Sequence, residues 1–313
     1  MGMLGYIVRR VLVAIPLLIV ISLLAFALNQ LSSQDPAEVV LRAQEVPVVT
    51  QELIAETRAE LGMDRPFLVR YADWLVQSLQ LDYGDSYVTG QPVWSMLAPA
   101  FMNTFKLTLV SVIAMIALSV AFGAFCALRE GSGTDRSVRG AFFVLTSLPP
   151  YLLATFMVWY FAVKLDWLPT SGMESYASYV LPVIVITVSY AGIYFRMIRT
   201  SMIGNLHEDY VLYGRASGLP ERIVTRHLLR NSMQVAVSVF GMAIPIILGS
   251  TVVVENLFAW PGLGTLSVKA ILSRDLPIIQ AYVLVLAAAF VLFNAVADIV
   301  NAALNPRLRE DAR

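Results

Sequence analysis

The fold is decided by a stretch at residues 107–128, which reads LTLVSVIAMIALSVAFGAFCAL and contains no Asp, Glu, Lys or Arg. A helix needs about 20 mostly apolar residues to cross the hydrocarbon core of a bilayer. Further stretches without these charged residues lie at 11–34, 140–163, 179–195, 231–254 and 276–297. Only 179–195 is short, and it reaches spanning length if Arg196 and Arg199 snorkel to the interface. We therefore predict an all-α polytopic membrane protein with six transmembrane helices.

The composition agrees with this prediction. The chain of 313 residues is 58% apolar and 14% charged, with a mean hydropathy of +0.71, whereas soluble domains carry about 25% charged residues. Long apolar runs also exclude a membrane barrel, whose strands alternate polar and apolar residues over about 10 positions. The net charge is zero, so nothing indicates a nucleic-acid partner. One cysteine, Cys126, forms no internal disulfide or thiolate cage, and we interpret it as packing.

The orientation follows from the positively charged residues. If the N-terminus lies inside, the cytoplasmic segments carry 14 Lys and Arg residues and the external segments carry 8. Cytoplasmic loops are the ones enriched in these residues. The first run is too long for a secretion signal, and no small-residue cleavage pattern follows it. We therefore predict a retained first span and a multi-pass protein of the cytoplasmic (inner) membrane with both termini in the cytoplasm.

The loops differ in length, which divides the chain. We expect an N-terminal segment and first span at 1–34, an external cap region at 35–104, a five-helix core at 105–304 and a cytoplasmic tail at 305–313. In the cap, 50–61 predicts a helix with Thr50 as N-cap and Gly62 just past its end. Residues 67–79 predict a second short helix. The turn at 129–139 is predicted to be short and cytoplasmic.

The cytoplasmic loop at 201–230 carries the most information. The residues Leu212, Ala216, Leu219 and Ile223 follow a helical stripe, and Gly218 and Pro220 suit the end of one helix and the start of the next. We predict two short helices in an elbow, with Gly214 and its small neighbours keeping one side slim. Such an elbow either docks into a groove of a partner protein or lies on anionic lipid, and the residues alone do not choose.

A resemblance makes that choice. Gly218 and the run His227-Leu228-Leu229-Arg230-Asn231 resemble the EAA coupling loop of the permease subunits of ATP-binding-cassette (ABC) importers, in the dipeptide, oligopeptide and nickel family. The likeness extends along the chain. It includes residues 6–10, 35–36, 61–66, 82–86, 255–264, 274–277 and 305–307. Two departures stand out: Leu212-Tyr213-Gly214 replaces Glu-Ala-Ala, and Val235 replaces a proline that usually marks the start of the fifth span.

The resemblance implies the type I permease fold, with an external helical cap and a cytoplasmic coupling-helix elbow. It implies a second homologous permease, two ATPase subunits that hold ATP and Mg, an extracytoplasmic substrate-binding protein and membrane lipid as partners. No cofactor is expected in this chain. The residues expected to couple to the ATPases are Glu208, Asp209, Tyr210, Gly214, Arg215, Ala216, Gly218, Leu219, Pro220 and Arg222.

An enzyme is the alternative class. The chain has no Walker loop and no H-E-x-x-H or G-x-S-x-G motif, so no catalytic residue is predicted. Asp298 is an acid within a span and a functional candidate by default, although we favour interhelical hydrogen bonding or an arginine partner. Prolines within spans are tolerated beside protein or a water-filled cavity. A translocation pathway is therefore predicted near Pro149, Pro150 and Pro245, with Phe258 and Trp260 as either gate or interfacial belt residues.

The substrate is the least determined property. The spacing of the cap and a short third loop resemble the nickel and metallophore branch, with di- or oligopeptides as the alternative. The two histidines, His207 and His227, both lie in the cytoplasmic loop, so no metal site is predicted in the spans. If metal is the cargo, it is expected to cross as a chelate that the binding protein selects.

Overall fold

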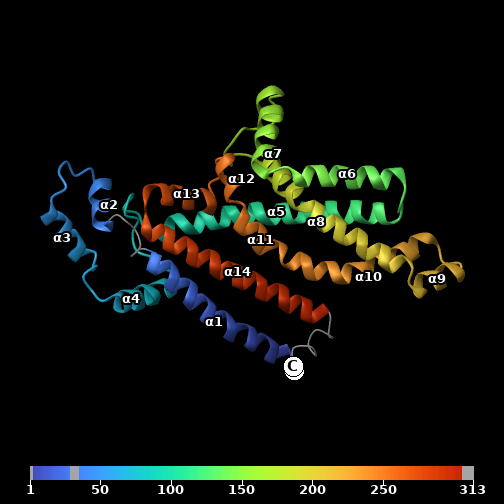
Figure 1. Ribbon diagram of the computed structural model, residues 1–313, viewed down its shortest axis with the longest axis horizontal. Helices are drawn as coiled ribbons and strands as arrows, with labels where there is room; N and C mark the ends of the chain where they lie inside the picture. Colours follow the sequence, from blue (N-terminus) through green and yellow to red (C-terminus); the bar gives the residue numbers. More distant parts are fainter. Residues whose placement is uncertain (1–2, 29–34, 305–313) are drawn as a thin grey trace. The chain divides into compact units, whose positions relative to one another are not determined.

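The computed structural model describes residues 3–28 and 35–304, and these residues form helices and loops without a named strand (Figure 1). The α-helices are α1 (Met3–Leu28), α2 (Pro36–Ala43), α3 (Gln51–Glu60), α4 (Phe67–Leu79), α5 (Val93–Ala127), α6 (Gly133–Ser147), α7 (Pro150–Met157), α8 (Val180–Leu206), α9 (Asp209–Ala216), α10 (Glu221–Gly241), α11 (Ala243–Ser250), α12 (Val252–Leu257), α13 (Leu263–Ser273) and α14 (Leu276–Leu304). A π-helix at Val158–Lys164 follows α7, and a 3₁₀ turn at Tyr176–Tyr179 precedes α8.

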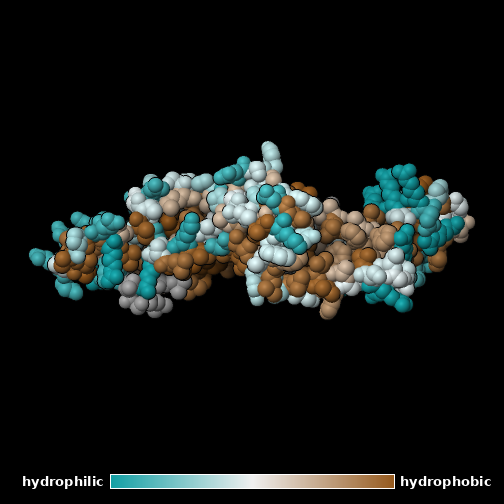
Figure 2. All heavy atoms as spheres, turned by 90° about the horizontal axis from the view of Figure 1, so that it is seen from above, coloured by the Kyte–Doolittle hydropathy of each residue, from teal (hydrophilic) through white to brown (hydrophobic). Residues whose placement is uncertain are grey.

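The chain divides into two compact units. The first, here the core unit, takes Met1–Val8, Phe105–Trp260 and Leu292–Arg313, and the second, here the cap unit, takes Arg9–Thr104 and Pro261–Val291. The long helices α1, α5 and α14 each contribute to both units. Hydrophilic residues gather at the ends of the view where α2 and α3 of the cap unit and α9 of the core unit lie (Figure 2).

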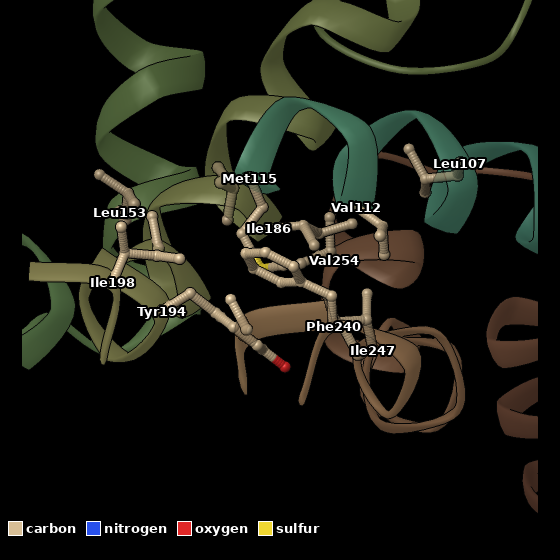
Figure 3. Packing of buried hydrophobic residues seen from close by; sticks show 14 of the residues in the cluster. Leu107, Val112, Met115, Leu153, Ile186, Tyr194, Ile198, Phe240, Ile247 and Val254 are labelled. Carbon is tan, nitrogen blue, oxygen red and sulfur yellow. The ribbon is translucent and has the colours of Figure 1, made fainter. Parts of the chain in front are cut away.

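The core unit is held by apolar side chains from α5, α7, α8, α10, α11 and α12, which point toward one another (Figure 3). Met115, Ile198 and Ile247 are fully buried. The rings of Tyr194 and Phe240 stack with centroids 5.5 Å apart. In the cap unit, Val93 and Leu97 of α5 pack with Leu263 of α13. Each unit therefore has a core of its own.

Within residues 3–28 and 35–304, three helices are long and apolar enough to cross a membrane: Val93–Ala127, Tyr176–Leu206 and Leu276–Ala302. The pair Gly133–Ser147 and Pro150–Lys164 meets the same criteria together, but it is bent by 99°. The bend lies at Pro149 and Pro150, because proline has no amide hydrogen to donate to the helix. The apolar part of α1, Leu12–Ala27, is shorter than the predicted span.

The predicted fifth span at 231–254 is not one continuous helix. Helix α10 runs through residue 235 and ends at Gly241, and α11 begins at Ala243. With valine rather than proline at 235, the helix continues unbroken. Pro245 cannot donate to the carbonyl of Gly241, so the break falls there instead. Gly241 also packs tightly, because a Cβ atom on it would lie 2.7 Å from Cβ of Ala297.

The cap helices match their local signals. Thr50 Oγ1 accepts a hydrogen bond from the amide of Leu53 at 3.3 Å, Gly62 has φ of +66°, and α4 has the predicted bounds. The structure adds α2, which begins after Asp35, whose Oδ1 accepts from the amide of Ala37 at 3.1 Å. Asp35 therefore opens a helix of the cap; residues 29–34, the predicted end of the first span, lie outside the described residues.

Candidate functional site

The elbow, defined here as residues 208–222, contains the short helix α9, the turn that follows it and the first residues of α10. The amide of Leu219 donates to the carbonyl of Gly214 at 3.1 Å, and the amide of Gly218 donates to the carbonyl of Arg215 at 3.0 Å. This pair of bonds is the Schellman motif, which needs a left-handed residue after the helix. Gly218 supplies it with φ of +75°. The predicted helix end at Gly218 is therefore confirmed.

Two expectations about the elbow are wrong. Its second helix is not short, because α10 continues for 21 residues into the apolar region. Gly214 also does not lie on the outer surface of the elbow, where it was expected to let a partner approach the backbone. It is buried, and a Cβ atom there would lie 3.6 Å from both Leu219 Cδ1 and Val224 Cγ2. Gly214 therefore faces the start of α10, at a distance where a Cβ atom would make ordinary van der Waals contacts.

The four apolar residues of the predicted stripe do not form one helical face, because the helix is interrupted between Ala216 and Glu221. All four are nevertheless exposed, and so is a neighbouring tyrosine. The large side chains among these residues have exposed fractions of 57% at Leu212, 76% at Tyr213, 43% at Leu219 and 41% at Ile223. The anchoring residues are instead Val211, Val224 and Leu228, all buried. The elbow thus turns one apolar set inward and presents another outward.

A polar pair joins the two arms of the elbow. Arg215 Nη2 donates to Glu221 Oε1 at 2.7 Å. This hydrogen bond lowers the pKa of Glu221 and raises that of Arg215. Both side chains are exposed, so solvent screens the pair. The pair links α9 to the first residue of α10 and adds little stability.

The other predicted coupling residues lie on the same segment. Glu208 occupies the N-cap position of α9 without a side-chain capping bond, and Asp209 lies in the first turn of that helix. The hydroxyl of Tyr210 donates to Asn205 Oδ1 at 3.4 Å. Pro220 is the N-cap of α10, and Arg222 follows in its first turn as an exposed side chain. Ala216 ends α9 and is exposed. The structure brings the ten predicted residues together; their role stays a prediction.

Sequence reasoning missed an ion pair next to this segment. Asp135 is fully buried in the first turn of α6 and binds Arg199 of α8 and Arg139 of its own helix, with N–O distances of 2.8 and 3.3 Å. Arg199 was expected to snorkel to the interface. The sequence signalled only the helix start, because Ser132 and Asp135 have the spacing of a capped N-terminus. Helix α6 begins at Gly133, inside the predicted turn at 129–139.

A second missed contact joins two segments that carried the resemblance. Ser86 donates to Asp275 Oδ2, and the amide of Tyr87 donates to Asp275 Oδ1 at 3.1 Å. Asp275 is buried and precedes α14, where its carbonyl accepts from the amide of Ile279 at 3.1 Å. Arg274 before it adopts φ of +58°. One carboxylate therefore ties the loop after α4 to the start of α14.

The residues predicted near a pathway lie in different environments. Phe258 and Trp260 are buried in the core unit, where the ring of Trp260 meets Tyr179 edge-on with centroids 4.5 Å apart. Pro245 is also buried, whereas Pro149 and Pro150 are exposed at the bend between α6 and α7. Burial in the core unit does not suit membrane-surface belt residues. A pathway role for these five residues stays a prediction.

No group of three His, Cys, Asp or Glu side chains among the described residues is placed to hold a metal ion. Cys126 is buried and unpaired as a thiol. Asp298 is half-buried on α14 and interacts with other groups.

Comparison with known proteins agrees with this architecture. Residues 119–310 match the family described as binding-protein-dependent transport system inner membrane component, and residues 3–108 match the N-terminal domain of such components. The chain is 51% identical over 311 residues to the metal-staphylopine import system permease protein CntB of Staphylococcus aureus, covering 99% of this chain and all of the relative. It is 35% identical over 308 residues to the glutathione transport system permease protein GsiC of Salmonella choleraesuis, covering 98% and 99%.

Among solved structures, an inward-facing form of the MetNI methionine ABC transporter aligns with a TM-score of 0.58 at 18% identity. The alignment covers 67% of this chain and 96% of that one. The helical fold, the family match along most of the chain and the full-length relatives agree with one another. The chain therefore belongs to the inner membrane components of binding-protein-dependent transport systems, which are permease subunits of ABC importers and are not themselves enzymes.

Proposed function

We propose that this permease subunit imports nickel or a related metal as a complex with an organic chelator of the metallophore type. The observation that carries the proposal is the 51% identity to a metal-staphylopine permease along the full length of both chains. The more distant relative at 35% identity transports glutathione by its name. The peptide alternative is therefore an outcome of the test and not a second proposal.

The side chains of this subunit support a chelate as cargo in place of a bare ion. Nickel prefers imidazole, thiolate or carboxylate ligands converging on the ion. The six predicted spans contain no histidine, and their candidate ligands are Cys126 and Asp298. Thioethers such as Met157 and Met242 are soft and better suited to packing. Selection of the metal then belongs to the binding protein and to the chelator it holds.

The proposed assembly has five parts. This chain pairs with a second, homologous permease, two ATPase subunits bind ATP and Mg in the cytoplasm, and a soluble protein delivers substrate to the outer face. Six spans, an external cap at 35–104 and cytoplasmic termini complete the proposed topology. The distribution of 14 against 8 positively charged residues supports this orientation.

In the proposed coupling, the ATPase subunits bind the elbow and move it. Leu212, Tyr213, Leu219 and Ile223 are exposed apolar side chains on a segment anchored from within by Val211 and Val224. A short apolar helix surface that enters a groove on a partner is an established mode of recognition. Closure of the ATPases would then push the elbow as a rigid body and move α8 and α10, from which it extends.

The test is uptake of radioactive nickel by cells that lack their own nickel importers and express this permease with its companion subunits. We expect uptake that requires a chelator and saturates with the complex. Uptake that dipeptides or glutathione abolish, and that no chelator stimulates, would assign the chain to peptide import. As a further check, the purified permease pair should show no saturable binding of free Ni²⁺ below about millimolar concentration. Micromolar binding lost on Cys126→Ala or Asp298→Asn would contradict selection by the binding protein.

A further inference from the structure

The cap unit contains a cavity of about 760 Å³, here called the cap cavity. Small-molecule sites in proteins have volumes of about 300–1,000 Å³. Its walls come from α1, α2, the segment at 61–65, α4, the loop at 83–90 and the first turns of α14. The contact between Ser86 and Asp275 holds that loop against the start of α14. The cavity therefore has a fixed wall built from segments that are distant in sequence.

One cation in the wall lacks an acidic partner. Arg65 pairs with Asp73 at 3.3 Å. Arg70 has no carboxylate within ion-pair distance among the described residues; it donates to the carbonyl of Met63 at 3.4 Å and lies 5.8 Å from the ring centre of Phe26. An arginine fork that faces a cavity without a counter-ion suits a carboxylate, which it can bind through two parallel hydrogen bonds.

Two further donors in the wall have no acceptor. Gln280 is 6% exposed, and neither its Nε2 nor Trp74 Nε1 has a hydrogen-bond partner among the described residues. A buried donor without a partner is costly, and each such group needs an explanation. Burial also raises the pKa of the Tyr87 phenol, although the Arg70 charge opposes this, so the hydroxyl stays a donor at neutral pH. The cavity wall thus offers several donors. Two carboxylates also line it, that of Asp73, which is paired with Arg65, and that of Asp85, which is exposed.

The same wall offers flat apolar surfaces. Phe26 and Trp74 lie with ring centroids 5.5 Å apart, and Tyr83 also lines the cavity. Aromatic faces can stack on planar groups such as amides or imidazole rings while the cation and the amide donors bind oxygens. A cavity of this size is much larger than one acidic side chain, so a whole small molecule fits it better than a single residue of a docking protein.

We propose that the cap cavity is a binding site for a carboxylate-bearing metal chelate, held through Arg70, Gln280 and Trp74 before it enters the membrane. The proposal rests on the proposed import of a chelate, because it names a site for that substrate class on this chain. The carboxylates of the chelator contact the donors, and the metal stays in the chelator. No protein ligand to the metal is required.

The test uses the full chain in lipid nanodiscs and the nickel–EDTA complex, a compact dianionic carboxylate chelate, as the probe in equilibrium dialysis. We expect saturable binding to the unaltered chain and about tenfold weaker binding to Arg70→Gln. Arg58→Gln is the matched control, because it removes the same charge from the cap at a residue outside the cavity wall, and it should bind as the unaltered chain does. If both variants lose the same affinity for nickel–EDTA, the loss reflects the net charge of the cap and not a contact with Arg70. That result would overturn the site.

A second variant keeps the test independent of folding. Gln280→Leu retains the size of the side chain and removes the donor that has no partner. We expect at least threefold weaker binding of nickel–EDTA with a melting temperature equal to or above that of the unaltered chain. Unchanged binding would overturn a ligand role for Gln280 and, with unchanged binding to Arg70→Gln, the site as a whole.

Other probes separate the sources of a carboxylate. Nickel chloride alone should not bind in the cavity, and metal-free EDTA should compete with the complex. A hexaglutamate peptide that binds more tightly than nickel–EDTA would assign the cavity to an acidic segment of a partner protein and contradict the proposal. The binding site and the proposed function can fail separately. If uptake depends on a chelate but nickel–EDTA does not bind in the cap cavity, the site is rejected and the proposed function stands.

Discussion

Arg199 donates two hydrogen bonds to the carboxylate of Asp135, from Nε to Oδ1 and from Nη2 to Oδ2, each 2.8 Å long. The paired geometry is the strong form of an arginine–carboxylate contact. The carboxylate is fully buried and also accepts from the amide of Gly131 at 3.2 Å. It joins the first turn of α6 to the last part of α8, the helix that leads into the elbow.

Asp135→Asn should destabilise the protein strongly, because the substitution leaves the guanidinium of Arg199 without a counter-ion in a buried place. Breaking one partner of a buried pair costs about 3–5 kcal/mol. Thermal unfolding in detergent measures the loss. Glu38→Gln is the control, since its pair with Arg42 is a solvent-exposed contact within α2 and such pairs contribute about 0–1 kcal/mol. The double variant Asp135→Leu with Arg199→Met should recover most of the stability, and a loss as large as that of the single variant would argue against this account.

Gly218→Leu should leave the chain in the membrane and uncouple it from ATP hydrolysis. A branched side chain in the left-handed region costs about 1–2 kcal/mol of local strain, which distorts the Schellman turn and moves the exposed apolar residues of the elbow. The measurement is ATPase activity of the reconstituted transporter with and without loaded binding protein.

The matched control is Gly131→Leu. Gly131 has φ of +74°, and at Gly131, as at Gly218, a Cβ atom would meet no other atom within 4 Å. The substitution therefore introduces the same backbone strain in a different turn. We expect this variant to keep its response to loaded binding protein. Normal transport by Gly218→Leu would remove the elbow from the coupling mechanism.

A topology experiment tests the orientation. A reporter that is active only outside the cytoplasm should be active when fused after Gln77, in α4 of the cap, and silent when fused after Glu221, in the elbow. The excess of Lys and Arg on the proposed cytoplasmic side is the physical reason. The reverse pattern would overturn the orientation and the proposed coupling together.

The elbow should loosen in acid. Because the hydrogen bond from Arg215 lowers the pKa of Glu221, the pair is intact above the ordinary glutamate pKa and is lost as the pH falls through the lowered value. A spin label at Tyr213→Cys, in a Cys126→Ser background, should become more mobile over that range. Glu221→Gln should show the mobile spectrum already at neutral pH. An unchanged spectrum in that variant would mean that the pair does not set the elbow.

Local signals predicted the parts of the fold that depend on neighbouring residues. Thr50 and Gly62 frame α3, and Gly218 ends α9, because caps and left-handed turns are set within a few positions. The contacts made over long separations were not predictable in this way. Asp135 meets Arg199 across 64 residues, and nothing in either local sequence identifies its partner.

The spacing of apolar and small residues also did not predict which residues of the elbow face inward. Gly214 looks like a residue that opens an outer surface, yet it is buried and faces Leu219 and Val224 on the inside. The stripe of Leu212, Ala216, Leu219 and Ile223 has helical spacing, but the turn at Gly218 changes the direction of the chain in the middle of it. A periodicity count assumes a continuous helix, so it fails where a turn interrupts one.

The bond between Ser86 and Asp275 has a consequence for the order in which the protein is made. Its partners are 189 residues apart, and proteins form from the N-terminus onward during synthesis. The loop after α4 therefore cannot form its hydrogen bonds to the Asp275 carboxylate until most of the polypeptide has been synthesised. The wall of the cap cavity is complete only when α14 has begun to form. In chains that stop before residue 275 this loop lacks that contact, and it should be cut by proteases more readily than in the finished protein.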